Sequence, residues 1–365
     1  MQNRRTSSSY ARAIPIALAL TPLACSDAAI APQNPGSGGG VPQLSCSITD
    51  EEVVSGGPGK DGIPALSDPR TATAGEPGTE YLDPDDRVIG IKLGDLVLAI
   101  PLNIMWWHEI VNLEVGDRKV SVTHCPLTGS SMAFDRSGID GAELGVSGLL
   151  LRNNLIMYDR NTEESLWPQM TRQARCGARN GTVLDMVPTI EMTWDGWLTL
   201  HPNTEVVSSL TGFGRNYRLY PYDDYDKLSN NQLLFPINRF DSRRPAKERV
   251  LGIADPNGAR AYPFGELLEL GFTAVVDTET DAIFWDSLRQ AAMAYKKVLD
   301  GQTLDFYFEA GQIRDEQTES VWRIDGLAVS GPLAGKRLEP VAEAYVAYWF
   351  AWAAFHTDTE LWLTP

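Results

Sequence analysis

The chain has 365 residues, 43% of them hydrophobic, and a formal net charge of −17 at neutral pH. This size and composition predict a folded body with an ample core, arranged as two domains or as one large pseudo-symmetric unit. The acidic balance and the lack of a basic stripe exclude nucleic-acid binding, and four cysteines without a Cys-x-x-Cys pair exclude a disulfide scaffold.

Residues 1–24 predict a signal peptide. Three arginines precede an apolar run over 13–24, which is too short for a membrane span but typical of an export signal. The run ends before Cys25, which follows a small residue as in the cleavage motif of bacterial lipoproteins, so we expect lipidation of Cys25. Plain secretion is the alternative. We therefore expect an exported protein, anchored by lipid to a membrane surface on the periplasmic or extracellular face.

Residues 25–52 predict a flexible tether, because the segment is rich in Gly, Pro and Ser. Once Cys25 carries lipid, Cys46, Cys125 and Cys176 remain, an odd number in an oxidising compartment. Either one pair forms a disulfide and one thiol stays free, or all three stay reduced. A disulfide from Cys46 would join the tether to the folded body, whereas one between Cys125 and Cys176 would block a site built on Cys125.

Two segments of the folded region resemble each other in sequence. Residues 87–102 align without a gap on residues 249–264, and both copies predict a β-hairpin with a glycine in its turn. A further match lies downstream, where both copies carry tryptophans and a histidine at helical spacing. One unit therefore occurs twice, over about 87–207 and 249–362.

We expect an α+β fold, rich in β-structure, with two related subdomains produced by an internal duplication. The first copy, which carries the candidate site, would span 53–210, the connector 211–248, and the second, degenerate copy 249–362. Hairpin signals outnumber long amphipathic patterns, and the longest helical candidates are 287–299 and 342–355.

The duplication acts as an internal control, because a side chain present in both copies is explained by the shared fold. His201 and His356 occupy equivalent positions, so we expect both to be packed, hydrogen-bonded structural residues. His108 and Glu109 lack counterparts, since Leu270 stands in place of His108. Side chains that occur once are the candidates for function.

His124 and Cys125 also occur in the first copy alone. They end a predicted strand over 119–125, in which alternate residues face opposite sides of the sheet. The two side chains cannot both point into one site unless Pro126 re-aims one of them.

A series of motifs follows in a specific order along the chain. They occupy residues 56–69, 108–112, 122–127, 145–148, 157–160, 165–167, 211–225 and 349–356. Together they resemble the bacterial domain-of-unknown-function family 3179 over about 53–362. The resemblance implies no particular activity. Similar sequences carry Cys-Pro-Leu-Cys-Gly where this chain has Thr128 in place of the second Cys, so the Cys-x-x-Cys arrangement is absent here.

Two classes of function follow. In the first, Cys125, His108 and Glu109 form a nucleophile site, or Cys125, His108 and His124 bind a soft metal ion such as copper or zinc. A buried Cys and a packed helix His would leave the same pattern without a function. In the second, the protein is a non-catalytic, surface-tethered module whose aromatic, acidic groove binds a small-molecule or protein ligand. Metal content of the purified domain would distinguish these classes.

Overall fold

The computed structural model describes residues 46–49, 52–161 and 164–365, so the predicted signal peptide and Cys25 lie outside the described residues. The described part is rich in β-structure, as expected for the predicted α+β class, and its helices are short. None of these helices has both the length and the apolar character needed to cross a membrane.

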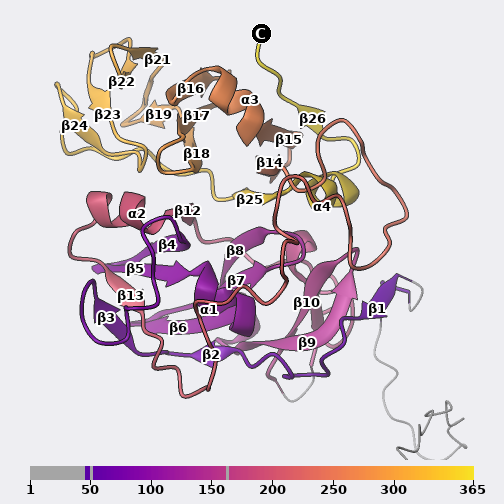
Figure 1. Ribbon diagram of the computed structural model, residues 1–365. Helices are drawn as coiled ribbons and strands as arrows, with labels where there is room; N and C mark the ends of the chain where they lie inside the picture. Colours follow the sequence, from indigo (N-terminus) through magenta and orange to yellow (C-terminus); the bar gives the residue numbers. More distant parts are fainter. Residues whose placement is uncertain (1–45, 50–51, 162–163) are drawn as a thin grey trace, which may run out of the picture. The chain divides into compact units, whose positions relative to one another are not determined.

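The first half of the chain contributes three sheets, followed in indigo to magenta in Figure 1. Its helices are α1 (Leu102–His108), α2 (Trp194–Leu200) and the 3-10 turns η1 (Ser137–Ile139) and η2 (Gln169–Thr171). Its strands are β1 (Val53–Ser55), β2 (Leu66–Ser67), β3 (Thr71–Thr73), β4 (Arg87–Leu93), β5 (Leu96–Pro101), β6 (Ile110–Val115), β7 (Arg118–Cys125), β8 (Ser130–Asp135), β9 (Leu144–Leu151), β10 (Asn154–Asp159), β11 (Leu166–Pro168), β12 (Ile190–Thr193) and β13 (Glu205–Val207).

The second half follows a similar order of elements. Its helices are α3 (Phe264–Glu269) and α4 (Trp349–Phe355). Its strands are β14 (Arg249–Asp255), β15 (Gly258–Pro263), β16 (Thr273–Asp277), β17 (Asp281–Asp286), β18 (Ala291–Lys296), β19 (Val298–Leu299), β20 (Gln302–Thr303), β21 (Phe306–Glu309), β22 (Gln312–Asp315), β23 (Val321–Trp322), β24 (Ala328–Ser330), β25 (Ala344–Tyr348) and β26 (Glu360–Leu361).

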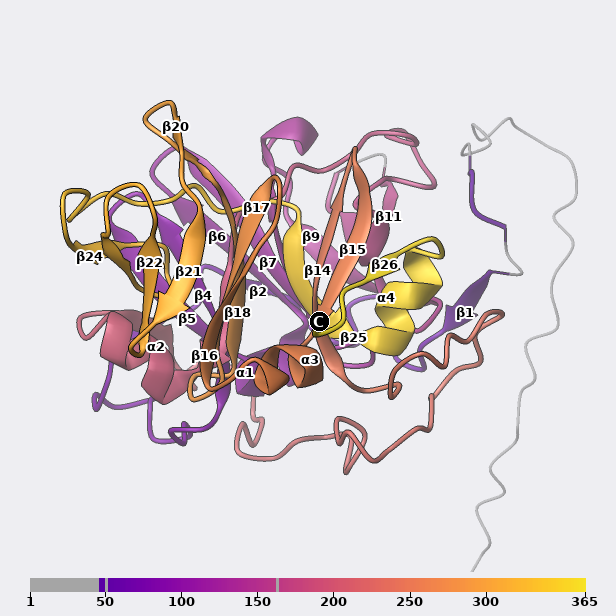
Figure 2. The same cartoon turned by 90° about the horizontal axis from the view of Figure 1, so that it is seen from above.

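One sheet in each half has the same strand order. The first half arranges β12-β4-β5-β13, with β3 added at the edge, and the second half arranges β25-β14-β15-β26. In both sheets the last strand pairs in parallel with the second strand of the hairpin, β13 with β5 and β26 with β15. Figure 2 shows α4 beside the β14–β15 hairpin. The two predicted hairpins are therefore confirmed as β4–β5 and β14–β15.

The helix predicted over 287–299 is wrong, because that segment contains β18, a strand whose first five residues are all buried. A strand buried on both faces shows no alternation, and its small alanines suit a helix equally well. The helix predicted over 342–355 is correct only in its second part, where α4 follows β25.

A glycine and a tryptophan pack together at the same place in each half. A Cβ added to Gly90 would lie 2.2 Å from the ring of Trp197, and one added to Gly252 would lie 2.1 Å from the ring of Trp352. In both halves the indole N–H donates at 2.8 Å to the hydroxyl of a threonine seven residues later. Because glycine has no side chain, the tryptophan ring can pack directly against the strand in each half.

The two predicted structural histidines follow these tryptophans and are half-buried rather than fully buried. His201 and His356 lie against the tryptophan of their own half, with ring centroids 4.3 and 4.1 Å apart. His356 Nε2 lies 3.1 Å from the Tyr345 hydroxyl, whereas His201 Nε2 has no hydrogen-bond partner among the described residues. The hydrogen bonding expected for both is therefore found at His356 Nε2 but not at His201 Nε2.

Two hydrophobic clusters each combine both halves. One packs β8 to β11 of the first half against β14, β15, β25 and α4 of the second. The other packs β12 and α2 of the first half against β17, β18 and β21 to β24 of the second. Among the described residues, the smaller clusters draw their buried members from one half, and Tyr217 of the connector joins one of them. The halves are thus interlocked, since each completes a core of the other.

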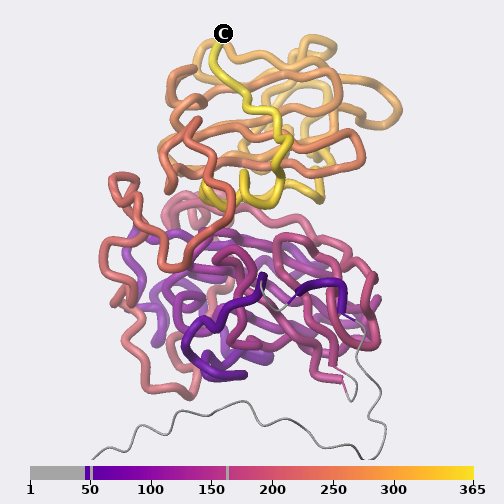
Figure 3. The backbone as a smooth tube through the Cα atoms, turned by 90° about the vertical axis from the view of Figure 1, so that its right-hand side faces the viewer, coloured from indigo at the N-terminus to yellow at the C-terminus, as the bar shows by residue number. Residues whose placement is uncertain are grey.

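The connector between β13 and β14 contains no helix or strand and lies against the first half (Figure 3). Hydrogen bonds attach it there, among them Asn103 Nδ2 to Tyr217 O at 3.1 Å, Tyr225 Oη to Leu127 O at 3.0 Å, and Phe235 N to Asn153 Oδ1 at 2.9 Å. The connector therefore covers first-half residues that would otherwise meet solvent.

Of the alternatives for the cysteines, the structure shows one disulfide and one free thiol. A disulfide joins Cys46 to Cys176, across 130 residues of sequence, and Cys125 is free and buried. The segment that ends the predicted tether is thus joined covalently to the folded body, and Cys125 is not blocked by Cys176.

Candidate functional site

The alternation of β7 sends its last two side chains to opposite sides, as the sequence predicts. His124 lines a cavity of about 300 Å³, and Cys125 joins the hydrophobic cluster on the other side. Residues from the first half, the connector and the second half all contribute to the cavity, which we call the junction pocket. Its charged and titratable members are Asp85, Asp86, Arg87, His124, Tyr220, Asp226, Lys227, Arg249 and Tyr348.

Two arginines of the junction pocket share one carboxylate. Arg87 and Arg249 are the first residues of β4 and β14 and therefore hold equivalent places in the two halves. Arg87 Nε lies 2.6 Å from Glu191 Oε1, and Arg249 Nε lies 3.7 Å from the same oxygen. The Glu191 side chain is 3% exposed. Two cations thus face one buried anion, and the lining of the pocket adds the carboxylates of Asp85, Asp86 and Asp226.

The charges set the ionisation of Glu191. Burial alone would raise the pKa of this carboxyl, but the nearby Arg87 and Arg249 outweigh burial and hold the pKa below its usual value. Glu191 is therefore ionised at neutral pH and accepts hydrogen bonds only.

A chain of hydrogen bonds connects Glu191 to His124. The Ser131 hydroxyl donates to Glu191 Oε2 at 2.6 Å, and His124 Nδ1 lies 3.0 Å from Ser131 Oγ. Because the Ser131 hydroxyl donates its hydrogen bond to the carboxylate, its oxygen must accept a hydrogen bond from His124 Nδ1. This assigns the neutral Nδ1–H tautomer to His124. Burial lowers the pKa of His124 to about 4, so the ring is neutral at pH 7 and its Nε2 is a free acceptor.

Two buried polar atoms of the junction pocket have no hydrogen-bond partner among the described residues. They are Arg249 Nε, a donor, and Asp226 Oδ1, an acceptor. Leaving such groups unpaired typically costs about 1–3 kcal/mol each. Native structures seldom accept this cost without a role for the group, so the pair marks the pocket as a place for a polar molecule.

Glu109 and Cys125, two of the predicted catalytic residues, are electrostatic neighbours. Glu109 follows α1 in the left-handed region, with φ of 57°, and is 6% exposed. Burial raises its pKa to about 8. Burial, followed by the charge of Glu109, raises the pKa of the Cys125 thiol to about 11. Because the thiolate is the reactive form, this environment suppresses nucleophilic chemistry at Cys125.

His108, the third predicted catalytic residue, has both ring nitrogens paired with other groups. Its Nδ1 is 2.7 Å from Pro64 O and its Nε2 is 2.7 Å from the Tyr217 hydroxyl. Burial, together with the charge of Arg215, lowers the pKa of His108. Both ring nitrogens have partners, so His108 holds the connector and the 64–66 segment in place.

The metal set expected from Cys125, His108 and His124 is not assembled. His124 faces the junction pocket, Cys125 Sγ lies 3.5 Å from the Asn153 carbonyl, and His108 faces the connector. Within the described ranges, no three His, Cys, Asp or Glu side chains are grouped so as to hold a metal ion. The donors do not fit copper or zinc, because the bonds to such ions are only about 2.0–2.3 Å long.

Comparison with known proteins identifies a family. The family described as protein of unknown function (DUF3179) matches residues 60–359. The chain belongs to the DUF3179 family. No curated protein and no solved structure matches the chain. The DUF3179 match begins before β2 and ends within the segment that leads to β26, so it includes the hairpins of both halves and the whole junction pocket.

Sequence reasoning missed four polar residues at or beside the junction pocket of this DUF3179 domain, namely Arg87, Arg249, Glu191 and Ser131. Arg87 and Arg249 were visible as identical first residues of the two aligned hairpins, but identity between copies suggested a structural role. Glu191 and Ser131 carried no motif at all, because their partners come from distant parts of the chain. A search for charged residues repeated at equivalent positions would have found the arginine pair.

Proposed function

We propose that the protein is an exported, lipid-anchored binding protein whose site is the junction pocket, and that its ligand is a small zwitterion such as an α-amino acid. One observation carries this proposal: two arginines from equivalent positions share a single buried carboxylate. The predicted alternative of a tethered binding module is therefore favoured over a metal or thiol site.

The unpaired atoms specify the ligand. Arg249 offers a buried donor with positive charge, which suits a carboxylate, and Asp226 offers a buried acceptor oxygen, which suits an ammonium group. Arg249 also lies over the ring of Tyr348, at 5.6 Å, which holds the guanidinium in position. A molecule with one group of each sign would satisfy both atoms at once.

Thermal unfolding tests the proposal. Common α-amino acids are added to the protein in separate samples. They are compared with their amides, which lack the carboxylate, and with their N-acetyl forms, which lack the ammonium group. We expect at least one free amino acid to raise Tm and both of its derivatives to lose most of that effect.

Arg249→Met should abolish the rise in Tm, whereas the matched control Arg218→Met should keep it, because the Arg218 side chain is 56% exposed and does not line the junction pocket. Near-UV circular dichroism checks that each variant is folded. An absence of any shift in wild type, or an equal shift in Arg249→Met, would contradict the proposal.

A second candidate function is proton transfer by His124. The Glu191–Ser131–His124 chain supports it, because this chain orients the ring and leaves Nε2 as a proton acceptor beside the pocket. Nitrogen NMR should find the Nδ1–H tautomer, neutral down to about pH 5 given the pKa of about 4. Ser131→Ala should mix the tautomers. Titration of His124 near its usual value would remove this candidate.

Export and anchoring remain part of the proposal. The Cys46–Cys176 disulfide supports export, because disulfides persist in oxidising compartments. Metabolic labelling with palmitate should mark the wild type and be lost in Cys25→Ser. Equal labelling of the two would rule out attachment at Cys25.

We also propose that the halves arose by duplication, with copies at 53–210 and 249–362 joined by the connector 211–248. The common strand order of the two hairpin sheets and the repeated glycine–tryptophan contacts support this origin. An experimental structure should superpose Gly90 and Trp197 on Gly252 and Trp352. Unrelated positions for these pairs would refute the duplication.

A further inference from the structure

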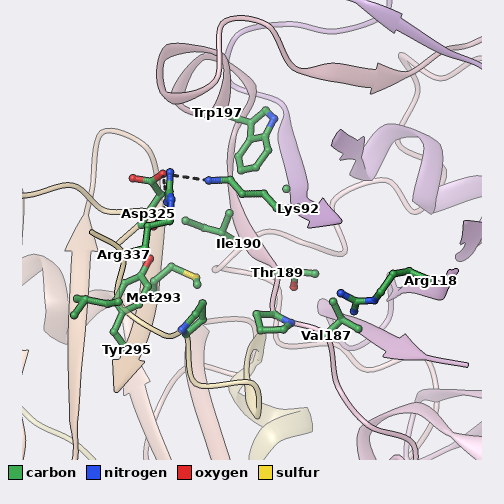
Figure 4. Close-up of a pocket in the computed structure, with 14 residues that line it drawn as sticks. Lys92, Arg118, Val187, Thr189, Ile190, Trp197, Met293, Tyr295, Asp325 and Arg337 are labelled. Atoms are coloured by element: carbon green, nitrogen blue, oxygen red, sulfur yellow. Dashed lines mark hydrogen bonds and ion pairs between the residues drawn. The ribbon is translucent and has the colours of Figure 1, made fainter. Parts of the chain in front are cut away.

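A second cavity, of about 260 Å³, lies between the hairpin sheet of the first half and β18 with the 337–340 segment of the second (Figure 4). Its wall is mainly apolar and includes Ile190, Trp197, Met293 and Leu338. The space corresponds to about nine water molecules at their volume in the liquid. It shares no lining residue with the junction pocket, and we call it the aromatic cleft.

One end of the aromatic cleft carries an excess of positive charge. Asp325 Oδ2 lies 3.4 Å from Lys92 Nζ, 2.7 Å from Arg323 Nη2 and 3.0 Å from Arg337 Nη1. None of these three cations has another carboxylate within salt-bridge distance in the described part of the chain. Three positive groups therefore converge on one negative group, in a chain whose net charge is −17.

The excess of positive charge affects the pKa of the neighbouring His201. Burial, together with the charges of Lys92, Arg323 and Arg337, which Asp325 only partly offsets, lowers the pKa of His201 to about 4. His201 Nε2 lies 3.8 Å from Asp325 Oδ2 and has no hydrogen-bond partner among the described residues. Asp325 is thus occupied by its cations and leaves a positive field over the cleft.

We propose that the aromatic cleft binds a small aromatic carboxylate, with its ring against Trp197 and Met293 and its carboxylate beside Lys92 and Arg337. The ring would bury apolar surface, and thioether sulfur and indole both form favourable contacts with aromatic rings. Figure 4 shows the Lys92–Asp325 contact at one side of the cleft, with Ile190 and Met293 close to it and Arg118 at the far side.

The chemistry of the two cations favours a carboxylate over a neutral polar group. Arg337 has a planar guanidinium that can pair with both oxygens of a carboxylate, and Lys92 adds a point charge. Lys92 and Arg337 are partly exposed, with side-chain exposures of 34% and 43%, so both can reach a ligand without leaving Asp325 unpaired, because Arg323 remains bound to it.

This inference stands apart from the proposed function, since it concerns different residues and a different ligand class. Isothermal titration calorimetry of the folded protein with 3-phenylpropanoate and its neutral amide tests it. We expect the acid to bind at least about tenfold more tightly than the amide, as for loss of one charge-assisted hydrogen bond.

Arg337→Met should lower the affinity for the acid to that for the amide. The matched control Lys336→Met should bind like wild type, because Lys336 is 54% exposed, pairs with Asp300 and does not line the cleft. Met293→Trp should fill the cleft and weaken both ligands. Arg249→Met, which disables the junction pocket, should leave binding of the acid unchanged.

Equal affinities for acid and amide, absence of binding to wild type, or wild-type binding by Arg337→Met would each overturn the assignment. Unchanged binding by Met293→Trp would place the ligand outside the cleft and would overturn it too. Near-UV circular dichroism and Tm confirm that each variant is folded before its affinity is read.

Discussion

The two halves hold their hairpins in the same way and differ at the end of the helix that follows. In the first half, α1 ends on buried His108, and Glu109 turns into the left-handed region. In the second half, α3 ends at Glu269, and Leu270 and Gly271 follow near the surface. The two halves therefore differ at this helix end: the first places a buried imidazole and a buried carboxyl there, and the second places Leu270 and Gly271.

Repetition does not by itself exclude function, however. Arg87 and Arg249 are repeated, yet the interlocked halves bring them to a single place, where Glu191 serves both. The register of the sheets puts Val346 at the position equivalent to Glu191, since Glu191 pairs with Ile89 and Val346 with Leu251. Under the proposed duplication, Arg87 and Arg249 would be two copies of one residue that meet at a carboxylate supplied by the first half alone.

The largest effect should come from separating the halves. Residues 53–210 alone, or 249–362 alone, are expected not to fold, because two of the large hydrophobic clusters each require side chains from both. Urea unfolding followed by near-UV circular dichroism should show no cooperative transition for either fragment. A cooperative transition in one fragment would show that this half carries its own core.

The second prediction concerns the carboxyl of Glu109, which has no counterpart at the equivalent position of the second half. Glu109 stays protonated up to about pH 8 in the folded protein, whereas the ordinary pKa of its carboxyl is 4.5, so stability should fall as pH rises between these values. The loss should approach about 4 kcal/mol at 1.4 kcal/mol per pH unit. Glu109→Gln, which mimics the protonated form, should remove it.

Urea unfolding of wild type and Glu109→Gln at about pH 5 and about pH 9 measures this difference. The control is Glu114→Gln, because the Glu114 side chain is 46% exposed and should behave like wild type at both values. If Glu109→Gln and wild type change in parallel, Glu109 is ionised in the folded protein.

The third prediction compares the repeated glycines. Gly90→Ala and Gly252→Ala should each destabilise the protein by about 2 kcal/mol, because the new methyl group would overlap the ring of a buried tryptophan. The control Gly138→Ala should change the free energy of unfolding by less than about 0.5 kcal/mol, since no atom lies within 4 Å of its Cβ position. A large effect in one half only would mean that the two scaffolds differ in rigidity.

The smallest effect should separate the two repeated histidines. His356→Phe removes the contact between His356 Nε2 and the Tyr345 hydroxyl and should cost about 1 kcal/mol. His201→Phe removes a nitrogen that has no hydrogen-bond partner in the described part and should be close to neutral. Chemical denaturation of both variants decides the point, and equal losses would show that His201 has a partner in solution.

Some of this architecture could be predicted from sequence. The hairpins at 87–102 and 249–264 carried turn glycines between β-branched runs, a signal confined to neighbouring residues. The opposite faces of His124 and Cys125 followed from strand alternation. In contrast, the His108 ring is paired with Tyr217 of the connector, which lies 109 residues away in the sequence. Long-range contacts of this kind leave no local pattern.

The disulfide also determines how the body would respond to a pull on its N-terminal segment. If Cys25 is attached to a membrane, tension along the tether enters the folded body at Cys46 and passes through a covalent bond to Cys176. The next strand, β1, is an edge strand held to β9 by three residue pairs, and an edge strand is easily peeled from a sheet. The covalent link bears the mechanical load before β1 does. Reduction of the Cys46–Cys176 disulfide would therefore transfer the load to β1, which could then be pulled away from β9.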